Sequence, residues 1–252
     1  MGNKIAAEYY NQKEEIRLNK YISEAGYCSR READRLIEAG KVRIDGKTAV
    51  CGSKVHPGQT VTIGKKVIGK KDEMVVLAVN KPVGIICTEE RHTRNSIVRF
   101  LDYPIRVTYV GRLDKDSEGL LLMTNNGDII NRMMRAGNYH EKEYKVTVNK
   151  EVTVDFVNRM ASGVHIRDEE KGLDAVTRPC EVEKIGKYTF RIVLTQGMNR
   201  QIRRMCEALG YRVTKLKRIR VMNIELGDLK PGEYRKLTDD ELNDLYEMIK
   251  NN

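Results

Sequence analysis

The stretch Gly-Arg-Leu-Asp-Lys-Asp-Ser-Glu-Gly-Leu-Leu-Leu-Met-Thr, residues 111–124, decides the fold class and contains the first candidate site. Its second half, residues 120–124, is mostly apolar, as is typical of a buried strand. Its first half places three carboxylates and two cations between two glycines. A loop beside a buried strand can hold a polar side chain rigidly against the core. A charged surface turn has the same pattern, so this stretch alone leaves both interpretations open.

The runs around this stretch predict one large domain over residues 74–252. Strand-like runs occur at residues 74–79, 107–110, 120–124, 144–148, 188–194 and 215–226. Helical runs occur at residues 128–136, 153–162 and 199–209, and a closing helix starts with the capping-box pair Thr238 and Glu241. Strands outnumber helices and most connections are short. The pattern therefore favours an α+β domain built on a largely antiparallel mixed sheet with flanking helices.

Residues 14–64 predict a smaller module of two helices followed by a small sheet. The second helix begins at Ser29, which forms a capping box with Glu32. Asp45-Gly46 is a hairpin-turn dipeptide, and a second strand pair is expected around Pro57-Gly58. A Lys- and Gly-rich stretch follows, and we expect residues 65–73 to be a linker.

The whole chain is basic, and the smaller module carries a cluster of its cations. Forty-six Lys and Arg residues against 36 Asp and Glu give a formal charge of +10, which indicates a polyanionic partner, either nucleic acid or an anionic membrane surface. The alternative is a merely solubilising surface. The cations around the second helix and the next strand are Lys20, Arg30, Arg31, Arg35, Lys41 and Arg43. This helix-loop-helix-strand pattern resembles the S4 RNA-binding module.

Composition excludes several classes of protein. A chain of 252 residues with 33% charged residues has no run of about 20 apolar residues, so no membrane-spanning helix is expected. Five scattered cysteines do not resemble a disulfide framework, and a reducing cytoplasm is the expected location. No Cys-x-x-Cys pair and no Gly-rich phosphate loop occurs, so neither a metal nor a nucleotide cofactor is expected.

Two further stretches carry candidate chemistry. In residues 197–205, Asn199 is expected to cap a helix whose Ile202 faces the core, while Arg200 and Arg203 lie on another face. The alternative is a basic helix that only touches phosphates. In the strand 144–148, Tyr144 shares a face with the apolar residues. By default such a tyrosine is a core or edge residue.

Taken together, these stretches resemble the bacterial rRNA pseudouridine synthases of the RsuA-like branch. Gly-Arg-Leu-Asp at 111–114, followed by Ser-Glu-Gly-Leu-Leu, and Asn-Arg-Gln-Ile-Arg-Arg-Met at 199–205 carry the resemblance, which covers nearly the whole chain. Residues 136–144 are most similar to the RluF subgroup. The resemblance implies that the protein isomerises a uridine of rRNA to pseudouridine without a cofactor. The similarity to the RluF subgroup implies that this rRNA is that of the large subunit. A tRNA is a further candidate substrate, and the protein is expected to be a cytoplasmic monomer.

The resemblance also implies roles for single residues. Asp114 matches the essential aspartate, Tyr144 the ring-facing tyrosine, and Arg203 the arginine that pairs with the aspartate. Arg112 matches a residue near the space vacated by the flipped nucleotide, and Leu216 an apolar wall of the pocket. The remaining expected RNA contacts are Arg200, Arg30, Arg31, Arg35 and Lys41.

Two other classes of protein stay open from the sequence. One is a non-catalytic S4-type RNA-binding or ribosome-assembly protein, in which the second domain is only a clamp. The other is a carboxylate-metal nuclease that uses Asp114, Asp116 and Glu118 as ligands.

Overall fold

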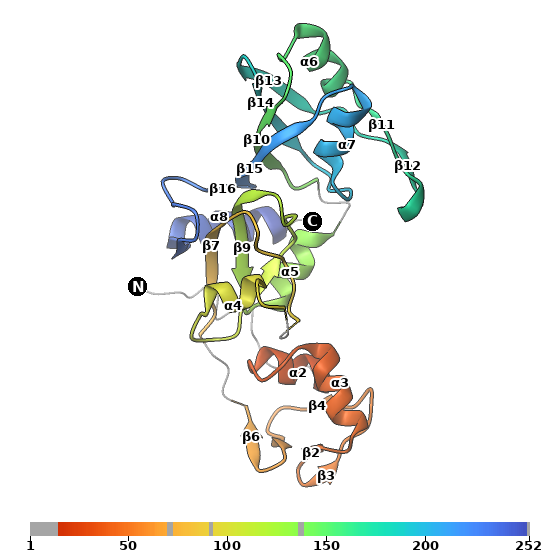
Figure 1. The fold of residues 1–252 in the computed structure, drawn as a ribbon. Helices are drawn as coiled ribbons and strands as arrows, with labels where there is room; N and C mark the ends of the chain where they lie inside the picture. The colour runs from red at the N-terminus through yellow and green to blue at the C-terminus, as the bar shows by residue number, and fades with distance from the viewer. Residues whose placement is uncertain (1–14, 70–72, 91–92, 136–138, 251–252) are drawn as a thin grey trace. The chain divides into compact units, whose positions relative to one another are not determined.

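The computed structural model describes residues 15–69, 73–90, 93–135 and 139–250. The chain forms two compact units that divide between Met74 and Val75 (Figure 1). Part of the predicted linker, at 70–72, and part of the segment used for the subgroup, at 136–138, lie outside the described residues.

The first unit packs two helices against small antiparallel sheets. Its elements are β1 (Ile16–Arg17), α2 (Leu18–Glu24), α3 (Arg30–Glu38), β2 (Val42–Ile44), β3 (Lys47–Thr48), β4 (Lys54–Val55), β5 (Val61–Ile63) and β6 (Lys66–Ile68). The main sheet has the order β3-β2-β5-β6, and β1 pairs with β4. Leu18 and Ile22 of α2 meet Val61 of β5 in one buried cluster. The two expected helices and the small sheet are therefore present.

The turn chemistry of this unit matches the sequence in two places. The Oγ of Ser29 accepts a hydrogen bond from the Glu32 N–H at 3.2 Å. The Glu32 carboxylate instead accepts from Arg35, so only half of the expected capping box forms. Asp45 and Gly46 both have positive φ, 48° and 80°, as the tight turn between β2 and β3 requires.

Two expectations for this unit were wrong. The turn at Pro57-Gly58 does not join a strand pair, because β4 pairs with β1 and β5 pairs with β2. The linker begins later than residue 65, since β6 pairs with β5 and buries Ile68. The sequence pattern did not indicate this strand, because the segment is rich in Lys and Gly and only one of the three side chains of β6 is buried.

The second unit is built on a nine-stranded mixed sheet. Its strands are β7 (Val76–Lys81), β8 (Thr108–Val110), β9 (Glu118–Thr124), β10 (Lys142–Val148), β13 (Glu181–Gly186), β14 (Thr189–Leu194), β15 (Val213–Val221), β16 (Ile224–Glu225) and β17 (Tyr234–Lys236). The order is β13-β14-β10-β15-β9-β7-β17, with β8 beside β9 and β16 beside β15. Among the strand pairs that the structure describes in this sheet, only β15–β9 is parallel, which confirms an α+β fold on a largely antiparallel sheet.

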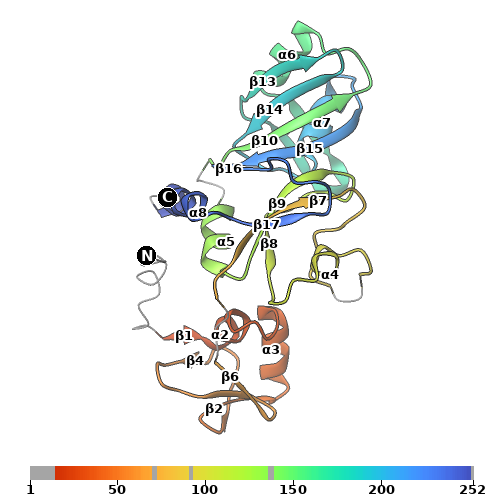
Figure 2. The same ribbon diagram turned by 90° about the vertical axis from the view of Figure 1, so that its left-hand side faces the viewer.

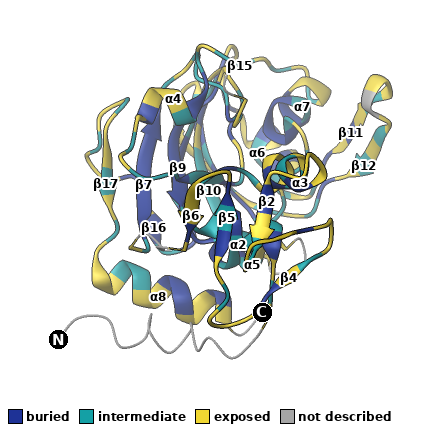
Figure 3. Ribbon diagram, turned by 90° about the horizontal axis from the view of Figure 1, so that it is seen from below, coloured by how far each residue is buried: buried dark blue, intermediate teal, exposed yellow. Residues whose placement is uncertain are grey.

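Helices cover this sheet in two groups. Helices α6 (Val154–Ala161) and α7 (Gln201–Ala208) lie beside the part of the sheet formed by β10, β14 and β15 (Figures 1 and 2). Phe156 of α6 and Met205 of α7 share one buried cluster with these strands. Ile97 of α4 (Ile97–Leu101) joins a second cluster with β7 and β9. These two strands are dark blue for much of their length in Figure 3. Tyr144 packs against both clusters, and it therefore lies where the two halves of the sheet meet.

The remaining elements complete the second unit. Helix α5 (Gly127–Met134) contacts α8 (Asp239–Lys250), whose capping box is reciprocal: the Thr238 N–H donates to Glu241, and the Glu241 N–H donates to Thr238. A separate hairpin consists of β11 (His165–Asp168) and β12 (Leu173–Val176), which are joined by a 3-10 turn, η2 (Glu169–Lys171). No helix in the described part of the chain is long and apolar enough to cross a membrane.

Candidate active site

The loop between β8 and β9 presents Asp114 from a firmly held backbone. The Leu113 N–H donates to the Sγ of buried Cys87 at 3.4 Å, and the Gly84 N–H donates to the Lys115 carbonyl at 2.7 Å. Within the loop, the Ser117 N–H donates to the Asp114 carbonyl at 3.1 Å. Leu113 and Ser117 are buried, whereas the Asp114 side chain is 34% exposed. The loop is therefore not a free surface turn, and its aspartate is accessible.

Arg200 supplies the counter-charge to the carboxylates of this loop. Its Nη1 lies 3.7 Å from Oδ2 of Asp114, and its two terminal nitrogens donate to the two carboxylate oxygens of Asp116 at 3.2 Å each. Burial would raise the pKa of Asp116, but the hydrogen bond from Arg200 and the charges of Arg203 and Arg200 lower it overall. The hydrogen bond to Asp116 in turn raises the pKa of Arg200.

Arg203, in the first turn of α7, donates hydrogen bonds to the same loop. Its Nη2 donates to the Asp116 carbonyl at 2.8 Å and to the Ser117 Oγ at 3.3 Å, and it lies 3.4 Å from the Asp116 carboxylate. The expected Arg203–Asp114 ion pair does not form; Arg200 takes that place. Arg203 is buried on the helix, and its contacts are with Asp116 and Ser117 of the loop.

The start of α7 also differs from the expectation. Arg200, not Asn199, is the N-cap, and it adopts a left-handed conformation with φ 52°. The Asn199 side-chain oxygen instead accepts from Arg204, which also pairs with Asp168 of β11. The unusual backbone at Arg200 therefore coincides with the residue that faces Asp114.

The other predicted residues of the second unit occupy different environments. Tyr144 is partly buried on β10, where it pairs with Ile192 on one side and Arg218 on the other. Leu216 is buried on β15 within the apolar cluster that Tyr144 also contacts. Arg112 is exposed, and its side chain has no partner in the described part of the chain.

The structure adds residues that the sequence pattern did not single out. Lys81 ends β7 and is fully buried, and its Nζ donates to the carbonyls of Pro82 and Ile85 at 2.9 and 2.8 Å. Burial lowers the pKa of Lys81. The sequence predicted only a turn from Asn80 to Gly84. The hydrophobic pattern gives no indication that a lysine in such a turn is buried. These contacts fix the turn whose Gly84 holds the Asp114 loop.

In the first unit, the four predicted RNA contacts are all exposed. They are Arg30, Arg31, Arg35 and Lys41. Arg35 donates to Glu32 at 3.2 Å. The four cations therefore lie free of the core on α3 and on the residue before β2, where a polyanion can reach them.

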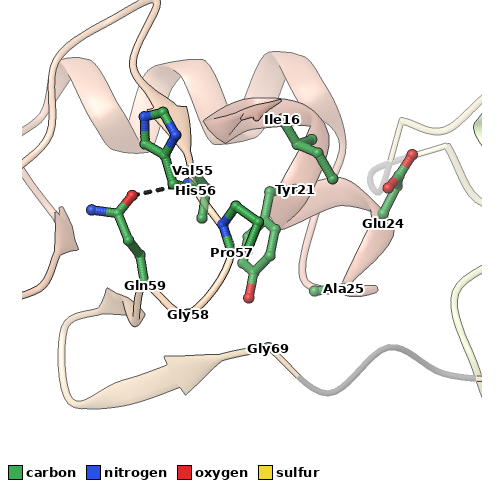
Figure 4. Close-up of a pocket in the computed structure, with 10 residues that line it drawn as sticks. All are labelled: Ile16, Tyr21, Glu24, Ala25, Val55, His56, Pro57, Gly58, Gln59 and Gly69. Atoms are coloured by element: carbon green, nitrogen blue, oxygen red, sulfur yellow. Dashed lines mark hydrogen bonds between the residues drawn. The ribbon is translucent and has the colours of Figure 1, made fainter. Parts of the chain in front are cut away.

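This unit also contains a pocket of about 220 Å³ (Figure 4). It lies between Tyr21 of α2 and the turn at Pro57, and Gln59 at its rim accepts a hydrogen bond from the His56 N–H at 2.9 Å. None of its lining residues comes from the unit that carries Asp114.

The carboxylates of residues 114–118 do not form a metal site. No three His, Cys, Asp or Glu side chains within the described ranges are grouped as a metal ion would require. Asp116 is instead engaged by Arg200 and Arg203. This geometry does not support the metal-nuclease alternative.

Comparison with known proteins places this geometry in a family. Residues 75–208 match the RNA pseudouridylate synthase family, and residues 16–67 match the S4 domain. The dual-specificity RNA pseudouridine synthase RluF of Escherichia coli is 52% identical over 94% of this chain and 80% of its own length. The ribosomal large subunit pseudouridine synthase B of Buchnera aphidicola is 34% identical over 92% of this chain and 97% of its own.

A solved structure of a pseudouridylate synthase agrees with these matches. It superimposes with a TM-score of 0.66 at 29% identity, and the superposition covers 91% of this chain and 99% of that one. The match over residues 75–208 takes in Asp114, Tyr144 and Arg203, and the S4 match takes in the exposed cations of α3. With its S4 domain joined to such a catalytic domain, the chain belongs to the RNA pseudouridine synthases of the RluF type and is an isomerase.

Proposed function

We propose that this synthase converts a specific uridine of large-subunit rRNA to pseudouridine, with Asp114 as the essential carboxylate. The observation that carries the proposal is the accessible Asp114 on a loop held by Cys87, Gly84 and Arg203. A carboxylate that must act on one sugar or base needs this kind of fixed position, because small misplacements are costly.

Two relatives support the choice of RNA. The Buchnera relative is described as acting on the ribosomal large subunit, and the Escherichia coli relative as a dual-specificity RNA enzyme. We therefore propose rRNA of the large subunit as the main substrate and a second RNA, a tRNA, as the other.

The isomerisation is balanced without any co-reactant. The bond from N1 to C1′ breaks, the uracil turns, and a bond from C5 to C1′ forms. C5 loses a proton and N1 gains one, so no electrons are exchanged with a cofactor. We accordingly propose that the reaction needs none.

We propose a division of roles among the residues around Asp114. The target base must leave the RNA stack at a cost of a few kcal/mol, and stacking on Tyr144 returns about 1–3 kcal/mol of it. Arg200 pairs with the carboxylates of Asp114 and Asp116, and Arg203 fixes the loop backbone. Exposed Arg112 fills the space that the base leaves, and Leu216 forms an apolar wall.

The two units divide the work in this proposal. Residues 14–64 hold the RNA, with Arg30, Arg31, Arg35 and Lys41 on its phosphates, and residues 74–252 carry out the reaction. All five cysteines are free thiols, which suits a cytoplasmic enzyme, and we propose that it acts as a monomer.

Mapping of pseudouridine across rRNA and tRNA tests this proposal. Cells with and without the protein are compared, and cells that carry Asp114→Asn serve as the third arm. One large-subunit rRNA site and one tRNA site should disappear in both deficient strains. Unchanged rRNA maps would overturn the rRNA assignment, and a site that survives Asp114→Asn would overturn the role of Asp114.

A further inference from the structure

Arg218 of β15 bridges the two ends of the Asp114 loop. Its side chain is buried, with the whole residue 3% exposed. Its Nε donates to the Leu120 carbonyl at 2.7 Å, and its Nη1 donates to the Arg112 carbonyl at 3.5 Å. Arg112 precedes Asp114 by two residues, and Leu120 is where the loop has joined β9. One planar guanidinium therefore contacts the loop at its start and at its end.

The backbone of Arg218 is locked to the same loop. Arg218 pairs with Gly119 in the parallel β15–β9 ladder. A Cβ at Gly119 would lie 2.2 Å from the Arg218 carbonyl oxygen and 2.6 Å from its nitrogen, and Gly119 has φ 107°. Only glycine allows this approach. This close contact fixes the backbone position from which the Arg218 side chain extends.

Arg218 also lies opposite Tyr144. A β-bulge shifts the β10–β15 register, so that Glu143 pairs with Arg220, Tyr144 pairs with Arg218, and Ile219 has no direct partner. Bulges of this kind redirect side chains and are common beside active sites. Arg220 secures the bulge by donating to Glu143 at 2.8 Å. One residue thus joins the strand of Tyr144 to the loop of Asp114.

The environment of Arg218 is not that of a simple stabilising ion pair. Within the described residues, its guanidinium donates to backbone carbonyls and forms no ion pair, and its buried Nη2 has no hydrogen-bond partner there. A buried charge without a counter-ion is costly for stability. Neutral side chains would fill the space at lower cost, so the cost points to a role in function.

We propose that Arg218 is a positioning residue, which holds the Asp114 loop at both ends and sets it against Tyr144 so that both side chains face one nucleotide. The proposal rests on the catalytic role proposed for Asp114. Arg218 acts through the loop backbone and does not touch the RNA.

The test compares Arg218→Gln and Arg218→Lys with Arg235→Gln in the full chain. Arg235 is the matched control, because it lies on the same sheet and pairs with Glu241 at 2.7 Å, away from the loop. For each variant we would measure RNA affinity, thermal unfolding and the single-turnover rate of pseudouridine formation at saturating RNA. Lysine keeps the charge but lacks the planar fork that reaches two carbonyls.

Arg218→Gln should lower the single-turnover rate about 100-fold, as for a misplaced catalytic group, with RNA affinity changed less than about threefold. Arg218→Lys should recover part of the rate, and Arg235→Gln should keep the full rate. A wild-type rate in folded Arg218→Gln would overturn the proposal. If Arg218→Gln does not fold, a rate in Arg218→Lys within about twofold of wild type overturns it instead.

Asp114→Asn in the same assay separates the two proposals. If Asp114→Asn remains active, the role of Asp114 fails whatever the Arg218 variants do. If it is inactive while both Arg218 variants keep the full rate, only the positioning role of Arg218 fails.

Discussion

The guanidinium of Arg200 lies 3.7 Å from the Asp114 carboxylate and, at 3.2 Å, closer to that of Asp116. One arginine therefore serves two carboxylates of a single loop. Arg203, three residues later, holds the backbone of the same loop. The two arginines make different contacts: Arg200 lies beside both carboxylates, whereas Arg203 contacts the loop backbone and the Asp116 carboxylate. This separation makes the roles of the loop residues testable one at a time.

Asp114→Asn should abolish pseudouridine formation while RNA affinity stays near that of the wild type. Loss of an essential acid–base or nucleophilic group costs about 10²–10⁴-fold in rate. The amide has nearly the same shape, so the loop contacts of Leu113 and Ser117 should persist. Rate and affinity would be measured on an rRNA transcript. A parallel loss of affinity and rate would mean that Asp114 only binds RNA.

Asp116 should make part of the stability of the protein pH-dependent. Its pKa is lowered from the ordinary 3.8, so its stabilising contribution is fully present above that value and is lost as the pH falls through the lower folded pKa. Asp116→Asn should remove this loss. Unfolding temperatures between about pH 2 and about pH 6 check the expectation, because this range brackets the ordinary pKa of an aspartate. Identical pH profiles for the two proteins would contradict it.

The fold class and the family could be predicted from the sequence because they depend on local patterns. Each of these patterns extends over only a few residues, as in the apolar run after Gly119, the cap at Thr238 and the turn at Asp45-Gly46. The sequence analysis did not predict β11, β12, β13 and β17. At least half of the side chains in each of these strands are exposed, so they lack the continuous buried face that gives periodicity.

The contacts that join distant residues could not be predicted in this way. The expected Arg203–Asp114 pair followed from resemblance, whereas the observed Arg200–Asp114 pair depends on a left-handed backbone at Arg200. The bridge from Arg218 to Arg112 and Leu120 depends on which strands are neighbours. The hydrophobic periodicity of the sequence predicts neither the backbone conformation of Arg200 nor which strands are neighbours in the sheet.

Gly119→Ala should destabilise the second unit strongly. The added Cβ would meet the Arg218 carbonyl oxygen at 2.2 Å, and φ is 107°. Overpacking and backbone strain together cost about 3 kcal/mol or more. Gly197→Ala is the matched control, because nothing lies within 4 Å of its added Cβ. Denaturant unfolding measures both. An equal, small effect of the two substitutions would show that β9 and β15 can separate at no cost.

Arg31→Gln with Arg35→Gln should weaken RNA binding mainly at low salt. Both arginines are exposed on α3, where their charges can displace counterions from RNA phosphates. Each lost phosphate contact should reduce the slope of log affinity against log salt by about 0.7–0.9. The rate at saturating RNA should not change, because neither residue belongs to the unit with Asp114. Affinity titrations at several salt concentrations measure the slope, and Arg159→Gln, at an exposed arginine of α6, shows the effect of removing one positive charge from the other unit. An unchanged slope would remove these two arginines from the RNA-binding surface, and a lower saturated rate would show that the S4 domain also orients the target nucleotide.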